Sequence, residues 1–183
     1  MFGPYSKLIW NYLLGKHKSL WYSPPKNKKE LEEFTGTYTY VDDPDKQGFI
    51  KILGGWKEKN IVKLMLPIKN PKKNCNWTIE CHKKIESIVY NTFSMYKSEG
   101  FEEIYPIKQL GCFVPRHKML NPARSLSLHA YGIAIDINWK DNPVGSSGSI
   151  PANVITLFKQ YGFSWGGWWT RPKDPMHFEF YKR

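Results

Sequence analysis

The sequence predicts an α+β fold in which a small antiparallel sheet carries helices packed on one face. Two segments, 133–138 and 176–180, alternate strictly between apolar and other residues, which is typical of strands with one buried face. Apolar residues recur at helical spacing between 79 and 98, and again after Pro151. A chain of 183 residues with 16% aromatic residues is long enough to bury such a core.

Residues 1–74 are predicted to form a basic N-terminal extension, a helix followed by a small β-meander, which is either separate or integral to the domain after it. Apolar residues at helical spacing between 5 and 13 predict an amphipathic helix that packs on its own domain or touches a membrane surface. A charged connector follows at 26–33. Segments rich in β-branched and aromatic residues predict strands at 36–41, 49–56 and 61–66, with turns at 42–45 and 57–60. The polar stretch 70–74 is the best candidate for a domain boundary.

Residues 75–183 are predicted to hold the main helices and the alternating strands. A helix at 79–98 is expected to end at Gly100, and a strand at 104–114 leads to Arg116. The two alternating strands are separated by a Gly- and Ser-rich loop at 142–148 and by a helix that starts near Pro151 and ends at Gly162. A loop at 165–169 contains three tryptophans, and at least one of them is expected beside the functional site.

The formal net charge of +11 favours polyanionic partners, and the positive excess is densest in the N-terminal part. Nucleic acid is not expected as a partner, because no helix-turn-helix, zinc-finger or RNP pattern is present. We expect a monomer. No apolar run approaches the ~20 residues of a membrane span, and the short apolar segment at 8–14 is not interpreted as a signal peptide.

Cysteine usage predicts free thiols. The three cysteines are odd in number and lack CxxC spacing, which fits a reducing compartment. Cys75, Cys81 and His82 are either ordinary residues at the start of a helix or ligands of a second metal. Three aspartates of the 42–45 turn allow a calcium site, but turn chemistry explains them equally well.

The two alternating strands place polar side chains on one side of the sheet. The isoleucines at 133, 135 and 137 share one face, so Asp136 points to the other. His177 and Glu179 likewise face away from the apolar residues of their strand. If the strands pair with their apolar faces together, Asp136 and His177 emerge on the same side. His129 lies seven residues before Asp136, and a tight bend at Gly132 brings its imidazole back.

Two imidazoles and one carboxylate are a usual ligand set of catalytic zinc, with a fourth position left open. Asp174 lies three residues before His177, at the mouth of its strand, which suits a general base beside the metal. His117 is a rival ligand. Each of these residues alone is more often a surface or hydrogen-bonded residue, and only their combined spacing predicts a zinc site.

The pattern S-x-H-x-x-G-x-A-x-D at 127–136, followed by D-x-M-H-F at 174–178, resembles a family of zinc peptidases. The family includes D-alanyl-D-alanine carboxypeptidases, vancomycin-resistance D,D-peptidases and phage L-alanyl-D-glutamate endolysins, and the hedgehog signalling domain shares its fold. The sequence around the two patterns looks most like the phage branch. The resemblance covers roughly residue 75 to the C-terminus.

This resemblance implies a hedgehog/D,D-peptidase-like fold, with a zinc cleft on the sheet face opposite the helices. His129, Asp136 and His177 match the zinc ligands, and Asp174 matches the catalytic carboxylate. Arg116 matches an arginine that binds substrate or steadies the oxyanion, with Arg124 as the alternative. Glu179 is either a partner that orients a ligand or an ordinary surface residue.

The function implied is a zinc metallopeptidase that cleaves peptidoglycan stem peptides at the L-alanyl-D-glutamate bond, as a phage endolysin or another wall-degrading enzyme. A D-alanyl-D-alanine carboxypeptidase and a non-hydrolytic, hedgehog-like zinc-binding module are the alternatives. A phage enzyme would be made in the host cytoplasm and would reach the wall through a holin. The basic extension would contact the anionic envelope, and its β-meander would either bind the wall or form a flap of the catalytic domain.

Overall fold

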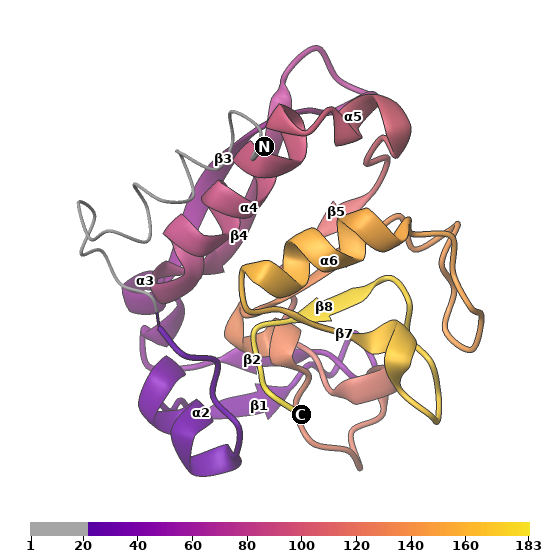
Figure 1. The fold of residues 1–183 in the computed structure, drawn as a ribbon. Coiled ribbons are helices and arrows are strands. Elements are labelled where there is room, and N and C mark those ends of the chain that lie inside the picture. The colour runs from indigo at the N-terminus through magenta and orange to yellow at the C-terminus, as the bar shows by residue number, and fades with distance from the viewer. Residues whose placement is uncertain (1–21) are drawn as a thin grey trace.

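The computed structural model describes residues 22–183, which fold into helices and three small antiparallel sheets (Figure 1). The expected α+β class is confirmed. In chain order, the elements are α2 (Lys28–Thr35), β1 (Tyr40–Asp42), β2 (Ile50–Ile52), α3 (Trp56–Asn60), β3 (Ile61–Lys69), β4 (Asn76–His82), η1 (Lys83–Ile85), α4 (Glu86–Ser98), α5 (Phe101–Ile104), β5 (Leu110–Gly111), η2 (Lys118–Leu120), η3 (Leu128–Tyr131), β6 (Ala134–Ile137), α6 (Ala152–Gln160), β7 (Ser164–Trp165), η4 (Gly166–Trp168) and β8 (His177–Glu179).

The central sheet has the strand order β5-β6-β8-β7 and contains both predicted alternating strands. The three isoleucines of 133–137 have no exposed surface, as the alternation predicts, and Phe178 beside them is also fully buried. The Phe158 ring of α6 packs 4.3 Å from the Phe178 ring. Figure 1 shows α6 lying across β7 and β8. The predicted helix after Pro151 is therefore confirmed, and it covers the apolar side of this sheet.

A second layer is the β3–β4 hairpin with α4 along it, and here the prediction of one helix over 79–98 was wrong. Its first four residues belong to β4, where Ile79 pairs with Leu64 and Cys81 with Val62. Alternation decides the structure of this stretch, because Ile79 and Cys81 both point into the core. The helix begins only at Glu86, after a single turn of η1.

The predicted strand at 104–114 was also wrong, since only Leu110–Gly111 pairs within the sheet. The chain before β5 bonds to a side chain instead of a neighbouring strand. Asn138 Oδ1 accepts hydrogen bonds from the backbone N–H groups of Lys108 and Gln109, at 2.7 and 3.1 Å, and Asn138 Nδ2 donates to the Pro106 carbonyl at 3.0 Å. An asparagine thus takes the place of a strand partner.

The N-terminal strands do not form the predicted three-stranded meander. β1 pairs with β2, whereas β3 pairs with β4. A short helix, α3, stands where a turn was predicted at 57–60, and α2 stands where a charged connector was predicted. α2 forms because Asn27 caps it, accepting a hydrogen bond from Glu30 N at 2.9 Å.

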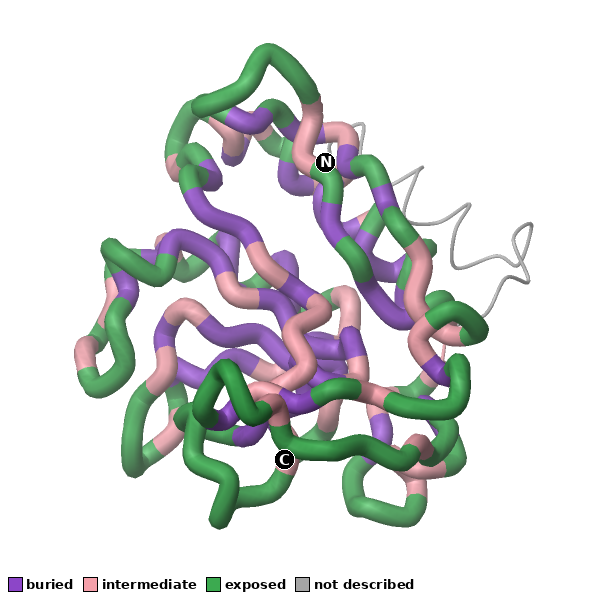
Figure 2. The backbone as a smooth tube through the Cα atoms, turned by 180° about the vertical axis from the view of Figure 1, so that it is seen from behind, coloured by how far each residue is buried: buried purple, intermediate pink, exposed green. Residues whose placement is uncertain are grey.

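Residues from the predicted extension share the core with the rest of the chain. Phe34, Leu64, Leu66 and Ile68 belong to the same buried cluster as the central sheet. The candidate boundary at 70–74 forms the turn between β3 and β4. Figure 2 shows buried backbone running through the middle of the molecule, with exposed loops around it. The amphipathic helix predicted at 5–13 lies outside the described residues. Within 22–183, no helix has the length and apolar character needed to cross a membrane.

Candidate metal centre

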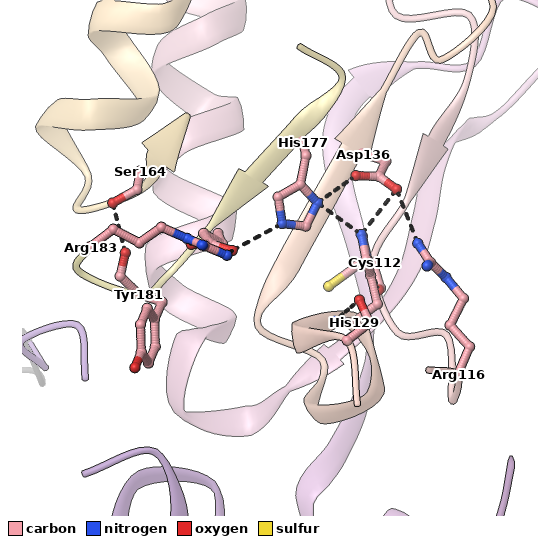
Figure 3. A network of polar contacts seen from close by, with 10 residues as sticks. Cys112, Arg116, His129, Asp136, Ser164, His177, Tyr181 and Arg183 are labelled. Carbon is pink, nitrogen blue, oxygen red and sulfur yellow. Dashed lines mark hydrogen bonds and ion pairs between the residues drawn. The ribbon is translucent and has the colours of Figure 1, made fainter. Parts of the chain in front are cut away.

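Three side chains converge on one point of the central sheet (Figure 3). His129 Nε2 lies 2.9 Å from Asp136 Oδ2, and His177 Nδ1 lies 2.9 Å from Asp136 Oδ1. The two imidazole nitrogens are 3.1 Å apart. The structure therefore brings together the three residues that the sequence predicted as zinc ligands.

Local structure explains how each donor reaches this point. Asp136 and His177 are directly opposite each other in the β6–β8 ladder, so both side chains leave the same face of the sheet. His129 comes from η3, a short helix that ends at Gly132 with φ of +68°. This left-handed turn reverses the chain immediately before β6, which returns the imidazole to Asp136. The bend predicted at Gly132 is confirmed.

The hydrogen bonds of both imidazoles fix which nitrogen faces the centre. His129 Nδ1–H donates to the Cys112 carbonyl at 2.6 Å, and His177 Nε2–H donates to Glu179 Oε2 at 3.2 Å. Consequently His129 Nε2 and His177 Nδ1 present lone pairs to each other and to a carboxylate. Such a set of acceptors is satisfied by a proton on one imidazole or by a metal ion between them, and imidazole nitrogens oriented by outer partners are how metal-binding histidines are usually held. The residues present thus fit a divalent cation such as Zn²⁺.

The electrostatics of the centre also favour a cation. Burial raises the pKa of Asp136, but the neighbouring His129 and His177 outweigh burial and hold the pKa well below its usual range. Burial lowers the pKa of His177, but the hydrogen bonds to Asp136 and Glu179 outweigh it and raise the pKa to about 9. The carboxylates around His177 therefore create a negative field where the donors meet.

Asp174 lies beside this centre, at the start of the turn into β8. Its Oδ1 is buried and has no hydrogen-bond partner in the part of the chain that the structure describes. Its backbone N–H donates to the Gly166 carbonyl at 2.9 Å, and a Cβ at Gly166 would stand only 2.4 Å from the Asp174 carbonyl oxygen. Only glycine allows this approach. Burial raises the pKa of Asp174, while His177 opposes the rise.

Arg116 points its guanidinium toward the centre, with Nη2 3.8 Å from Asp136 Oδ2. Its backbone is held by the β1–β2 hairpin. Phe49 forms an antiparallel bridge with Arg116, Ile50 N donates to Pro115 O at 3.1 Å, and His117 N donates to Gly48 O at 2.8 Å. The N-terminal hairpin therefore lies against the segment that presents this arginine.

His117, the rival ligand, is directed elsewhere. Its Nδ1–H donates to the Arg124 carbonyl at 2.7 Å, and its Nε2 lies 2.8 Å from Asp42 Oδ1. Among the described residues no second metal-binding group is present, either at Cys75, Cys81 and His82 or at the aspartates of the 42–45 turn. His82 Nε2–H donates to the Thr35 carbonyl, and Asp43 accepts from Asp45 N as a turn aspartate does.

One tryptophan of the 165–169 loop lies beside the centre, as expected, and another packs in the core. Trp165 is buried in the core, and its indole N–H donates to the Pro175 carbonyl at 2.7 Å. Trp169 lies against the centre, with its ring 5.3 Å from that of His177. Arg183 stacks on Trp169. The sequence did not predict this contact, because no local pattern marks a cation that follows the end of a strand.

The fold and the site together define a class: an α+β protein with a candidate His-Asp-His metal centre and a half-buried aspartate beside it. Comparison with known proteins adds one finding. Residues 121–180 match the model of a family described as D-alanyl-D-alanine carboxypeptidase. The matched segment contains the three donors and Asp174, but not Arg116. No curated protein and no solved structure matches the chain.

Proposed function

We propose that this protein is a zinc-dependent peptidase that hydrolyses the stem peptides of peptidoglycan, on a hedgehog/D,D-peptidase-like fold with the metal centre in its cleft. The proposal rests on one observation above all: three donors of the predicted zinc set meet within 4.8 Å, next to a buried Asp174 oxygen that has no protein partner among the described residues. The family match over residues 121–180 supports the same reaction class.

His129, Asp136 and His177 would hold the zinc ion, and a zinc ion in such a site supplies a Lewis acid that activates water near neutral pH. Asp174 acts as the general base and then the general acid. Its unpartnered Oδ1 accepts a proton from the attacking water and returns it to the leaving amine. The raised pKa of Asp174 suits this second step, because the carboxyl group then keeps the proton taken from water until the leaving amine accepts it.

Arg116 would bind the developing negative charge of the scissile carbonyl, or a carboxylate of the substrate. Its side chain is about one-fifth exposed, with a relative accessibility of 22%, so it is accessible to a ligand and still largely shielded from water. A preorganised cation in such a position stabilises a transition state more strongly than it would in open solvent.

The bond cleaved is proposed to be that between L-alanine and D-glutamate. An aspartate at the position of the base resembles the endopeptidase branch of the family, and the basic surface suits a substrate rich in carboxylates. A D-alanyl-D-alanine carboxypeptidase is the second candidate, because the matched family model bears that description.

Mass spectrometry of digested muropeptides separates the two candidates. The protein is incubated with purified peptidoglycan and with defined muropeptides, with and without a chelator, and Asp174→Ala serves as the inactive control. Release of stem peptides that begin with D-glutamate supports the endopeptidase. Free D-alanine as the sole product would establish the carboxypeptidase instead. Absence of any cleavage by zinc-loaded protein would favour a non-hydrolytic, hedgehog-like module.

The biological setting follows from the same proposal. We place the protein as a phage endolysin, made in the host cytoplasm, reaching the wall through a holin and acting as a monomer. The basic N-terminal region would contact the anionic envelope. A turbidity assay on permeabilised cells tests wall lysis directly, whereas tight nucleic-acid binding with a steep salt dependence and no lysis would contradict the proposal.

A further inference from the structure

Arg183 contacts two groups that both touch His177. Its Nε lies 2.6 Å from Glu179 Oε1 and its Nη2 lies 3.5 Å from Glu179 Oε2. Its guanidinium carbon also stands 4.2 Å from the centre of the Trp169 ring. Figure 3 shows Arg183 on the far side of His177 from Asp136 and His129.

Glu179 connects this arginine to the metal centre. Its side chain is 1% exposed, and its Oε2 accepts the Nε2–H of His177 at 3.2 Å. That hydrogen bond keeps the proton on Nε2, which leaves the lone pair of Nδ1 for the metal. A buried carboxylate is costly without a matching cation, and within the described residues Arg183 is the only ion-pair partner of Glu179 besides His177 itself.

Trp169 provides the second connection. Its ring lies 5.3 Å from that of His177 on one side, and Arg183 stacks on it. Arg183 therefore restrains an acceptor and an aromatic neighbour of the same imidazole. A planar guanidinium is suited to this double task, because its edge pairs with a carboxylate while its face stacks on an aromatic ring.

We propose that Arg183 is a positioning residue for the metal ligand His177, acting through Glu179 and Trp169. The inference depends on the metal centre of the proposed function but not on the reaction or its substrate. Arg183 lies outside the segment that matches the family model, which ends at residue 180.

If Arg183 acted on the metal only through its positive charge, removing it would change the zinc affinity in the opposite direction to a loss of positioning. A cation near a zinc site repels the metal, so loss of Arg183 through charge alone would tighten zinc binding. Loss of positioning instead weakens it, because a ligand whose outer partner is removed typically loses about 10–100-fold in metal affinity. The sign of the change therefore distinguishes the two roles.

The test is zinc affinity of the full chain, measured by competition with a chromophoric chelator. Arg183→Gln should bind zinc about 10-fold more weakly than the unaltered protein, at the low end of the range for outer partners of a ligand. The zinc affinity of Arg183→Lys, which keeps the charge but loses the planar fork, should lie between those of Arg183→Gln and the unaltered protein. Lys182→Gln, an exposed neighbour of equal charge, is the matched control and should bind as the unaltered protein does.

Two further measurements complete the test. In a double-mutant cycle, adding Arg183→Gln to Glu179→Gln should cost far less than Arg183→Gln costs alone, since the arginine acts mainly through that carboxylate. The absorption spectrum of the Co²⁺-loaded protein should change in Arg183→Gln and stay unaltered in Lys182→Gln. Thermal unfolding of the metal-free variants shows whether they fold, and Arg183→Lys provides the comparison if Arg183→Gln does not.

Unchanged or tighter zinc binding in Arg183→Gln would overturn the inference, and so would native affinity in Arg183→Lys if only that variant folds. Either result leaves the proposed function intact. Failure of the unaltered protein to bind any zinc would instead remove the metal centre, and the proposed function with it.

Discussion

Asp174 is half-buried, and its Oδ1 atom is shielded from solvent. Because its Oδ1 has no partner among the described residues, we expect Asp174→Ala to fold and bind zinc normally while losing about 10²–10⁴-fold in kcat, the usual contribution of a general base. Asp141→Asn, at an exposed aspartate paired with Lys108, is the control. Peptide hydrolysis and zinc stoichiometry are measured on both, and full activity in Asp174→Ala would remove this residue from the mechanism.

Arg116 should matter for catalysis and not for metal binding. Loss of a charged group that stabilises a developing oxyanion typically costs about 10²–10³-fold, so Arg116→Ala should lower kcat/KM by roughly this factor with zinc retained. Arg124→Ala is the matched control, since it removes an arginine of the same loop whose carbonyl, not its side chain, bonds to His117. If the loss occurs in Arg124→Ala instead, the arginine has been assigned wrongly.

At the scale of single elements, the turn at Gly132 determines where His129 lies. An added Cβ would stand 2.8 Å from His82 N and 2.8 Å from Ile61 Cδ1, at a φ of +68°. We expect Gly132→Ala to lower the free energy of unfolding by about 2 kcal/mol or more, from left-handed strain of about 1–2 kcal/mol plus the clash.

Gly54→Ala is the control for this substitution. Gly54 has a similar φ of +75° but open space around the missing Cβ, so it carries only the conformational cost. Denaturant unfolding of both variants, with zinc removed, measures the difference. Equal losses in the two variants would mean that the contact with β4 is unimportant.

The elements that the sequence predicted correctly are those with a single clear periodicity. The alternating isoleucines of β6 and the helix after Pro151 each have one apolar face and local stop signals. The helix predicted for residues 79–82 was wrong because alternation and helical spacing overlap where β4 passes into η1 and α4. The strand predicted at 104–114 is mostly absent because the Asn138 side chain, about thirty residues away, bonds to the backbone of Lys108 and Gln109 in place of a neighbouring strand.

The site was more predictable than the fold around it. Its three donors and Asp174 occur in two short patterns with fixed spacing, so register alone brings Asp136 opposite His177. The supporting contacts are non-local. Neither the bridge between Phe49 and Arg116 nor the contacts of Arg183 with Glu179 and Trp169 correspond to any local periodicity.

At the scale of the whole molecule, acid should destabilise the fold through His82. Burial lowers its pKa to about 4, from 6.5 when exposed, even though its bond to the Thr35 carbonyl acts in the other direction. The stability that depends on neutral His82 is fully present above pH 6.5 and is lost as the pH falls through about 4.

The lowering of the His82 pKa from 6.5 to about 4 corresponds to a loss of roughly 3 kcal/mol of folding free energy between pH values above 6.5 and pH values below 4. Denaturant unfolding at pH 7 and at pH 4, with chelator present at both, should show a smaller loss in His82→Gln than in the unaltered protein. Parallel losses in the two proteins would assign the acid sensitivity to other groups.

Zinc should stabilise the molecule because its ligands come from η3, β6 and β8. Binding to the folded state alone adds about 2.7 kcal/mol when free zinc is 100 times its dissociation constant. The melting temperature should therefore rise with zinc concentration, and His177→Ala should abolish the rise. A zinc-independent melting temperature in the unaltered protein would argue against a metal centre.

The antiparallel bridge between Phe49 and Arg116 has a consequence for protein engineering. Chimaeric proteins are made by grafting a segment of one protein onto a module of another. A graft that began at residue 75 would transfer the three candidate metal donors and Asp174, yet it would leave behind β3 and the hairpin that holds the backbone of Arg116. We expect such a hybrid to fold poorly, because β4 would lose its partner strand and the core would lose Leu64, Leu66 and Ile68. A useful junction should therefore lie before Asn27, ahead of α2.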